Sequence, residues 1–266
     1  MKPIGVSFIL GLAAAAAVCF FTEGWAWIAL YWLGFAVAFS VLLWFVLWII
    51  SLFVRKRVYQ EPSALYQRLL NLGYAYICEG ARLKVKTSGL EKLPDEPFLL
   101  VSNHLSNLDN MVQCLALGKR HIAFIAKEEL FRIPIVKGYI TRCCYIPIDR
   151  RSSKCGKSAV EQAEDYIRRG VCSIGVYPEG HRSRDGKVGK FHAGSFRTAI
   201  QTQCPIVVCA IMGTDKAKHR MPFRSTKVRF DVIDVVSPVG RKSTELAQNI
   251  QTIISDYISD TEEELK

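Results

Sequence analysis

The chain has 266 residues and carries 35 Lys and Arg against 24 Asp and Glu, a formal charge of +11 at pH 7. This length allows one sizeable domain plus an appendage, and the basic balance favours an anionic partner. No nucleic-acid-binding module signature accompanies the basic residues, which argues against nucleic acid as that partner.

The charge is unevenly placed along the chain. Residues 1–54 contain only two charged side chains, Lys2 and Glu23, which cancel, so the whole +11 belongs to 55–266. An apolar segment followed by a strongly basic body favours a membrane surface as the partner.

Two apolar runs, 4–21 and 25–54, predict an N-terminal two-helix membrane hairpin. All five tryptophans lie in this region, as expected for side chains at membrane interfaces. Lys2 and the basic residues 55–57 flank the runs, so the positive-inside rule places the N-terminus and the body on the cytoplasmic face. A cleaved signal peptide is disfavoured because the second run is long. A hairpin that rests in one leaflet stays open as an alternative to full spanning.

Nine cysteines, an odd number, occur without a C-x-x-C pair. This pattern predicts free thiols in a reducing compartment, and it gives no support to a zinc site.

Apolar spacing after the anchor predicts alternating helices and strands. Helices are expected at 64–77, 108–117, 128–141, 155–169, 193–202 and 244–259. Strands are expected at 82–86, 98–102, 122–126, 145–148, 173–177, 206–211 and 226–235. This alternation favours an α/β fold with a largely parallel sheet and helices on both faces. We therefore expect a membrane-anchoring hairpin over 1–58 and an α/β domain over 59–266.

The apolar run 98–102 ends in Asn103 and His104, and Asp109 follows five residues after the histidine. Five residues turn a helix by about 500°, so these two side chains would diverge by about 140° on one helix. They meet only if His104 precedes a helix whose first turns hold Asp109, with Ser106 or Asn107 as a cap. The carboxylate would then orient an imidazole that takes a proton from a hydroxyl. Spacing alone also fits a structural histidine.

A second polar stretch, 177–184, follows the apolar run 173–176 and reads Tyr-Pro-Glu-Gly-His-Arg-Ser-Arg. Together with Asn-His-x-x-x-x-Asp it resembles the signature boxes of the lysophospholipid and glycerolphosphate acyltransferase family. Tyr177 stands where the family box has Phe, and His181 where it has Thr. The second change means that any contact made by the threonine hydroxyl must differ here.

Two further boxes extend the resemblance, which covers roughly 98–211. The stretch 145–150 is similar to the family's intermediate box ending in arginine, and 204–208 is similar to its proline-containing fourth box. The four boxes occur in the family's order, which makes the match specific.

The resemblance implies transfer of an acyl chain from acyl-CoA or acyl-carrier protein to the free sn-2 hydroxyl of 1-acyl-glycerol-3-phosphate, forming phosphatidic acid. It implies His104 as general base and Asp109 as its orienting partner. The residues that it implies around the acceptor are Asn103, which also supports the turn, Lys127, Arg150, Glu179, Gly180, Arg182 and Ser183. The planar guanidinium fork suits phosphate. No cofactor beyond the acyl donor and no metal are implied.

Alternatives remain at this stage. The acceptor could be another lysolipid or glycerol 3-phosphate. A serine hydrolase is disfavoured because neither Ser106 nor Ser183 lies in a G-x-S-x-G elbow. A non-catalytic protein that binds anionic lipids could keep the same fold.

Residues 118–157 carry ten Lys and Arg against three acids, interleaved with apolar side chains over 130–140. This segment fits either a core helix broken at Pro134 or an interfacial segment that meets acyl chains and headgroups. The final run 261–264 is expected to be a solvated acidic tail.

Overall fold

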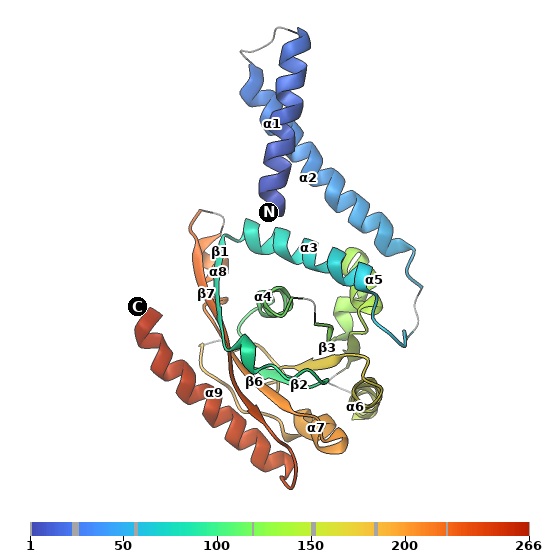
Figure 1. Ribbon diagram of the computed structural model, residues 1–266, viewed down its shortest axis with the longest axis vertical. Coiled ribbons are helices and arrows are strands. Elements are labelled where there is room, and N and C mark those ends of the chain that lie inside the picture. The colour runs from blue at the N-terminus through green and yellow to red at the C-terminus, as the bar shows by residue number, and fades with distance from the viewer. Residues whose placement is uncertain are drawn as a thin grey trace.

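A computed structural model of the chain describes residues 2–22, 27–55, 58–118, 120–149, 153–183, 186–221 and 223–265. A seven-stranded sheet carries helices on both faces, and two long N-terminal helices project from one end of it (Figure 1). The α-helices are α1 Pro3–Thr22, α2 Ile28–Leu52, α3 Ala64–Gly80, α4 Leu108–Ala116, α5 Pro134–Arg142, α6 Ser153–Arg168, α7 Arg197–Thr202, α8 Ala217–Arg220 and α9 Ser243–Leu265. Short 3₁₀ helices are η2 Leu90–Lys92, η3 Glu128–Arg132 and η4 Ala193–Phe196.

The strands are β1 Leu83–Ser88, β2 Leu99–Ser102, β3 Ile122–Lys127, β4 Ile146–Ile148, β5 Ser173–Val176, β6 Ile206–Met212 and β7 Thr226–Val236. Their order in the sheet is β1-β7-β6-β2-β5-β3-β4, and only the β6–β7 pair is antiparallel. The predicted largely parallel sheet is therefore confirmed. Because β2, β5, β3 and β4 are contiguous and parallel, their carboxyl ends share one edge of the sheet.

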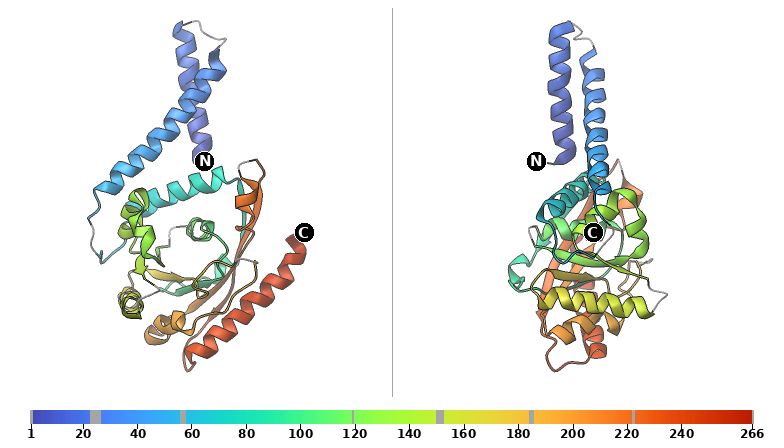
Figure 2. Two further views of the ribbon diagram at one scale, coloured as in Figure 1. Left: turned by 180° about the vertical axis from the view of Figure 1, so that it is seen from behind. Right: turned by 90° about the vertical axis from the view of Figure 1, so that its right-hand side faces the viewer.

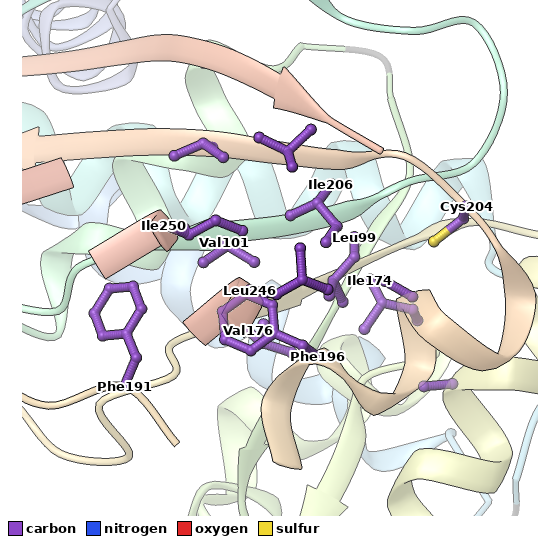
Figure 3. Close-up of a cluster of buried hydrophobic side chains, with 14 of the residues drawn as sticks. Leu99, Val101, Ile174, Val176, Phe191, Phe196, Cys204, Ile206, Leu246 and Ile250 are labelled. Atoms are coloured by element: carbon purple, nitrogen blue, oxygen red, sulfur yellow. The ribbon is translucent and has the colours of Figure 1, made fainter. Parts of the chain in front are cut away.

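Each face of the sheet has its own apolar core. Alternate residues of β2 point to opposite faces, so Leu99 and Val101 join one core and Leu100 the other. The first core packs under α6, α7 and α9, with Phe196 and Ile250 fully buried (Figure 3). The second lies under α3, α4 and α5. Burial on both faces explains why these strands are continuous apolar runs.

Helices α1 and α2 are long and apolar enough to cross a membrane, judged by length and composition. They pack closely: a Cβ atom added to Gly11 would lie 2.7 Å from the Ala36 backbone nitrogen. The indole nitrogen of Trp32 also donates to the Phe8 carbonyl at 2.8 Å. The predicted pair of apolar helices is thus present.

Both hairpin helices are tied to the body. The Glu79 carboxylate on α3 accepts from the backbone nitrogens of Ile4 at 2.8 Å and Gly5 at 3.2 Å, which caps the start of α1. On α2, the Ser51 hydroxyl donates to the Pro134 carbonyl at 2.8 Å and accepts from Gly138 N at 3.2 Å. These contacts fix the hairpin against α3 and α5 (Figures 1 and 2).

The segment over 128–141 is divided at Pro134, which starts α5 at a position that tolerates proline. Tyr139 and Ile140 of α5 are buried in the second core, whereas Leu130 and Ile133 are each 41% exposed. Helix α5 therefore belongs to the core, as the first interpretation predicts, whereas contact of the exposed part with acyl chains and headgroups stays a prediction.

Two other features differ from the prediction. Helix α9 continues to Leu265, so residues 261–264 are part of a helix rather than a separate tail. Helix α8 was not predicted, because four residues are too few to show a helical period.

Candidate active site

The site begins where β2 ends. Asn103 is only 1% exposed, and its amide exchanges two hydrogen bonds with the backbone of Ile211 on β6, both at 2.9 Å. This contact fixes the chain directly before His104. Asn103 thus has its amide oxygen and nitrogen engaged with backbone.

His104 and Asp109 meet as their spacing predicts. His104 precedes α4, Asp109 lies in the first turn of that helix, and the histidine Nδ1 is 2.7 Å from Asp109 Oδ2. The hydroxyl of Ser106 accepts from Leu108 N at 3.0 Å, which supports the start of α4. A carboxylate at a helix N-terminus is favoured by the orphan N–H groups there.

Asp109 is fully buried and is held from several sides. Its Oδ2 also accepts from the backbone nitrogens of Leu105 at 2.7 Å and Ser106 at 2.8 Å. Its Oδ1 accepts from the hydroxyl of Thr214, which follows β6. With Asp109 ionised, His104 donates from Nδ1, so Nε2 carries the lone pair that can accept a proton. The imidazole side chain is 17% exposed and therefore within reach of a ligand.

Tyr177 forms one side of the histidine pocket. Its ring stacks on His104 with centroids 4.1 Å apart, and its hydroxyl donates to Gln113 Oε1 on α4 at 2.9 Å. Burial raises the pKa of Tyr177 well above its usual value, so this hydroxyl stays a neutral donor. The tyrosine that replaces the family's phenylalanine thus has a dedicated acceptor.

Glu179 joins the two signature stretches. This fully buried carboxylate accepts from His104 N at 2.8 Å and from Gly189 N at 3.0 Å. Burial raises the pKa of Glu179, while the two backbone amides act in the opposite direction. Ser183 N in turn donates to the His104 carbonyl at 2.8 Å. Both carboxylate oxygens therefore hold backbone around the histidine.

Gly180 has a left-handed backbone, with φ at +72°, directly after Glu179. A side chain there would be strained, and its Cβ would lie 3.4 Å from the His192 ring. The left-handed backbone therefore favours glycine at this turn.

Two of the predicted cations, Lys127 and Arg182, lie at or beyond the ends of strands at the same edge of the sheet. Lys127 ends β3 and Arg182 follows β5, and both are exposed. Arg150 follows β4 and lies outside the described residues. The structure thus joins Glu179 and Ser183 to His104 by hydrogen bonds, fixes Asn103 directly before it, and leaves Lys127 and Arg182 at the surface.

A cavity of about 1040 Å³ adjoins this site. Tyr177, Glu179 and His181 form part of its lining, so the segment that holds His104 also forms a wall of the cavity. The rest of the lining includes Ile125, Ile148, Lys157, Ala159, Val160, Val176, His192, Ser195 and Arg197. Because Val176 belongs to the first core, the cavity reaches the face of the sheet that α6 and α7 cover.

Three residues that hydrogen-bond to members of the site were not predicted from the sequence: Thr214, Gln113 and Gly189. Thr214 had a usable signal, because a polar side chain directly after a parallel strand points to the same edge as His104. Gln113 and Gly189 had none, since each meets its partner through tertiary packing alone. Among the described residues, no group of three or more His, Cys, Asp or Glu side chains could hold a metal ion.

A buried carboxylate that orients a partly exposed imidazole at the carboxyl edge of an α/β sheet is an arrangement suited to enzymes that activate a hydroxyl by general base catalysis. Comparison with known proteins narrows this class. Residues 84–212 match the family model described as Acyltransferase. A probable 1-acyl-sn-glycerol-3-phosphate acyltransferase of Mycoplasma genitalium is 30% identical over 190 residues, which cover 65% of this chain and 70% of that protein. The chain belongs to this acyltransferase family.

A plant relative and a solved structure also carry the name of 1-acyl-glycerol-phosphate acyltransferases. The chloroplastic 1-acyl-sn-glycerol-3-phosphate acyltransferase of Arabidopsis thaliana is 36% identical over 135 residues, 50% of this chain and 37% of that protein. The chain therefore matches well under half the length of this plant relative. The crystal structure of the 1-acyl-sn-glycerophosphate (LPA) acyltransferase PlsC from Thermotoga maritima superposes with a TM-score of 0.58 and 28% identity, covering 82% of this chain and 87% of that one.

Proposed function

We propose that this protein transfers an acyl chain from a thioester donor to the free sn-2 hydroxyl of 1-acyl-glycerol-3-phosphate, forming phosphatidic acid. The relatives are named for acylation of 1-acyl-sn-glycerol-3-phosphate, which supports this acceptor. The single observation that carries the chemistry is the 2.7 Å contact between His104 Nδ1 and the fully buried Asp109.

The reaction needs no protein nucleophile. His104 Nε2 accepts the proton of the sn-2 hydroxyl, and the hydroxyl oxygen attacks the thioester carbonyl carbon. The C–S bond then breaks as the tetrahedral intermediate collapses, the ester C–O bond remains, and the imidazolium returns its proton to the leaving thiolate. Asp109 stabilises the imidazolium and holds the tautomer that leaves Nε2 free.

Both substrates have a place beside this pair. Lys127, Arg150 and Arg182 supply cations for the acceptor phosphate. The cavity behind the segment 177–181 combines an apolar lining that includes Val160 and Val176 with cations, and we assign it to the acyl donor, either acyl-CoA or acyl-carrier protein. No further cofactor is part of the proposal.

The proposed acceptor is a lipid, so a membrane anchor would bring the active site to the surface in which this substrate resides. We propose that α1 and α2 insert into a membrane and hold the α/β domain on its cytoplasmic face. The apolar composition of both helices and the basic residues 55–57 that follow α2 support this placement.

The test uses the full chain in detergent micelles with oleoyl-CoA or an acyl-carrier thioester and a panel of acceptors that includes lysophosphatidate, with products followed by mass spectrometry. We expect phosphatidate from the wild type and a 10²- to 10⁴-fold slower reaction, by the usual scale of a general base, for His104→Ala. The variant should still bind lysophosphatidate.

Other outcomes would change the proposal in defined ways. A different acylated acceptor would keep the mechanism and replace the substrate. No acyl transfer from either donor to any acceptor would leave the non-catalytic lipid-binding function in its place.

A further inference from the structure

An exposed basic segment, 218–224, lies between β6 and β7 and contributes nothing to the site described above. It reads Lys-His-Arg-Met-Pro-Phe-Arg and contains no acidic residue; Pro222 lies outside the described residues. Phe223 is 85% exposed and Met221 is 42% exposed. Exposed apolar side chains beside cations are the combination found where proteins meet a lipid interface.

The base of this segment is well anchored. Ala217 is fully buried, Met221 N donates to the Ala217 carbonyl at 2.9 Å, and Arg224 N donates to the Arg220 carbonyl at 2.9 Å. Over the described part of the chain, no carboxylate forms an ion pair with Lys218, Arg220 or Arg224. The segment therefore presents uncompensated positive charge on a fixed turn.

Its position relative to the hairpin suggests what it meets. Figures 1 and 2 show α8 and the chain that follows it at the end of the body from which the hairpin projects, level with α3 and the start of α1. The start of α1 is fixed there by Glu79, and Thr226 N, just after the segment, donates to the Arg82 carbonyl directly after α3 at 3.1 Å. The segment thus lies where the hairpin would leave the hydrocarbon of a membrane.

We propose that the basic segment is a second membrane contact that binds an anionic lipid surface. Met221 and Phe223 enter the interface, while Lys218, Arg220 and Arg224 meet lipid phosphates. The inference rests on insertion of α1 and α2 in the membrane. It does not depend on the acyl-transfer reaction.

The segment also lies close to the candidate active site along the chain. Thr214, whose hydroxyl donates to Asp109, is only four residues before Lys218. A membrane contact at 218–224 would therefore hold the histidine pair near the surface in which a lysolipid resides.

The experiment places an environment-sensitive fluorophore at either of two exposed apolar positions. The full chain carries the label at Phe223→Cys or, as a matched control, at Val239→Cys, which is 65% exposed just beyond the opposite end of β7. Each protein is reconstituted into vesicles of phosphatidylcholine with or without phosphatidylglycerol. When phosphatidylglycerol is present, we expect the fluorescence emission of the label at 223 to shift to shorter wavelength and to resist quenching by iodide. The label at 239 should stay accessible to iodide.

Paired charge variants test the electrostatic part. Each cation near an anionic membrane contributes about fivefold to docking, so Arg220→Gln with Arg224→Gln should weaken the protection at 223 by about 25-fold. Arg241→Gln with Lys242→Gln, two exposed cations on the β7–α9 turn, should leave it unchanged.

The proposal is overturned if the label at 223 is as accessible as that at 239 in both kinds of vesicle. Equal protection with and without phosphatidylglycerol would overturn it as well. Flotation of the full chain with phosphatidylcholine vesicles reports hairpin insertion separately, and acyl transfer by the unlabelled chain reports the proposed function.

Discussion

At the scale of single residues, His104 is held by Asp109, whose carboxylate is itself fixed from several sides. Asp109 accepts from two backbone amides, the imidazole and Thr214, so each carboxylate oxygen has at least one donor. A buried carboxylate needs this compensation, because desolvating a charge without partners is costly. The same contacts restrict the carboxylate to one orientation toward His104.

Thr214 should therefore act as a positioning residue. Thr214→Val keeps the shape and removes the hydroxyl that donates to Asp109, and a hydrogen bond to a charged group is worth about 1.5–3 kcal/mol. We expect kcat to fall at least about tenfold with KM nearly unchanged. Thr214→Ser, which restores a hydroxyl, should recover most of the rate. A rise in KM with unchanged kcat would contradict this role.

The raised pKa of Glu179 leads us to expect that the stability of the folded protein depends on pH. Its folded-state pKa is raised above the usual 4.5, so between that value and the raised one the folded protein holds a proton that the unfolded chain has lost. The stability contributed by this group is thus fully present below 4.5 and falls as pH rises through the folded pKa. Melting temperatures in detergent should show the wild type losing stability relative to Glu179→Gln across this window. A constant difference between the two proteins would contradict the raised pKa.

At the scale of elements, short signals specified most of the fold. The strand before His104 and the helix after it could be predicted, because apolar runs and a cap are local features. The contact of Glu179 with His104 N joins residues 75 positions apart, and the contact of Ser51 with Pro134 joins residues 83 apart. Local sequence patterns do not determine which distant residues pair, so these contacts could not be predicted.

Close packing of the hairpin gives a prediction at this scale. Gly11→Leu would place a side chain against Ala36, whereas Gly34 has no atom within 4 Å of an added Cβ. Overpacking costs about 1–3 kcal/mol, so we expect Gly11→Leu to lower the melting temperature in detergent by several degrees. Gly34→Leu is the matched control and should melt like the wild type. Equal melting of the two variants would show that the helices do not pack at Gly11.

At the scale of the whole molecule, the sheet edge gathers groups that come from widely separated parts of the sequence. His104 follows β2, Glu179 follows β5, and Thr214 follows β6, and these three strands are neighbours. The expectation that ligands collect beyond the carboxyl ends of parallel strands located this edge. The antiparallel direction of β7 was not foreseen, since an apolar run does not encode the direction of the strand that it forms.

The ties between hairpin and body predict the topology of the whole protein. Glu79 caps the start of α1, so insertion of the hairpin as proposed would leave the N-terminus on the same side of the membrane as the α/β domain. The basic residues after α2 predict that this side is the cytoplasm, as proposed above. Protease added to inverted membrane vesicles should remove an N-terminal tag and digest the body together, while sealed vesicles of native orientation should protect both. A tag that is protected where the body is digested would contradict the capped arrangement. Digestion of both only in vesicles of native orientation would instead reverse the side of the membrane.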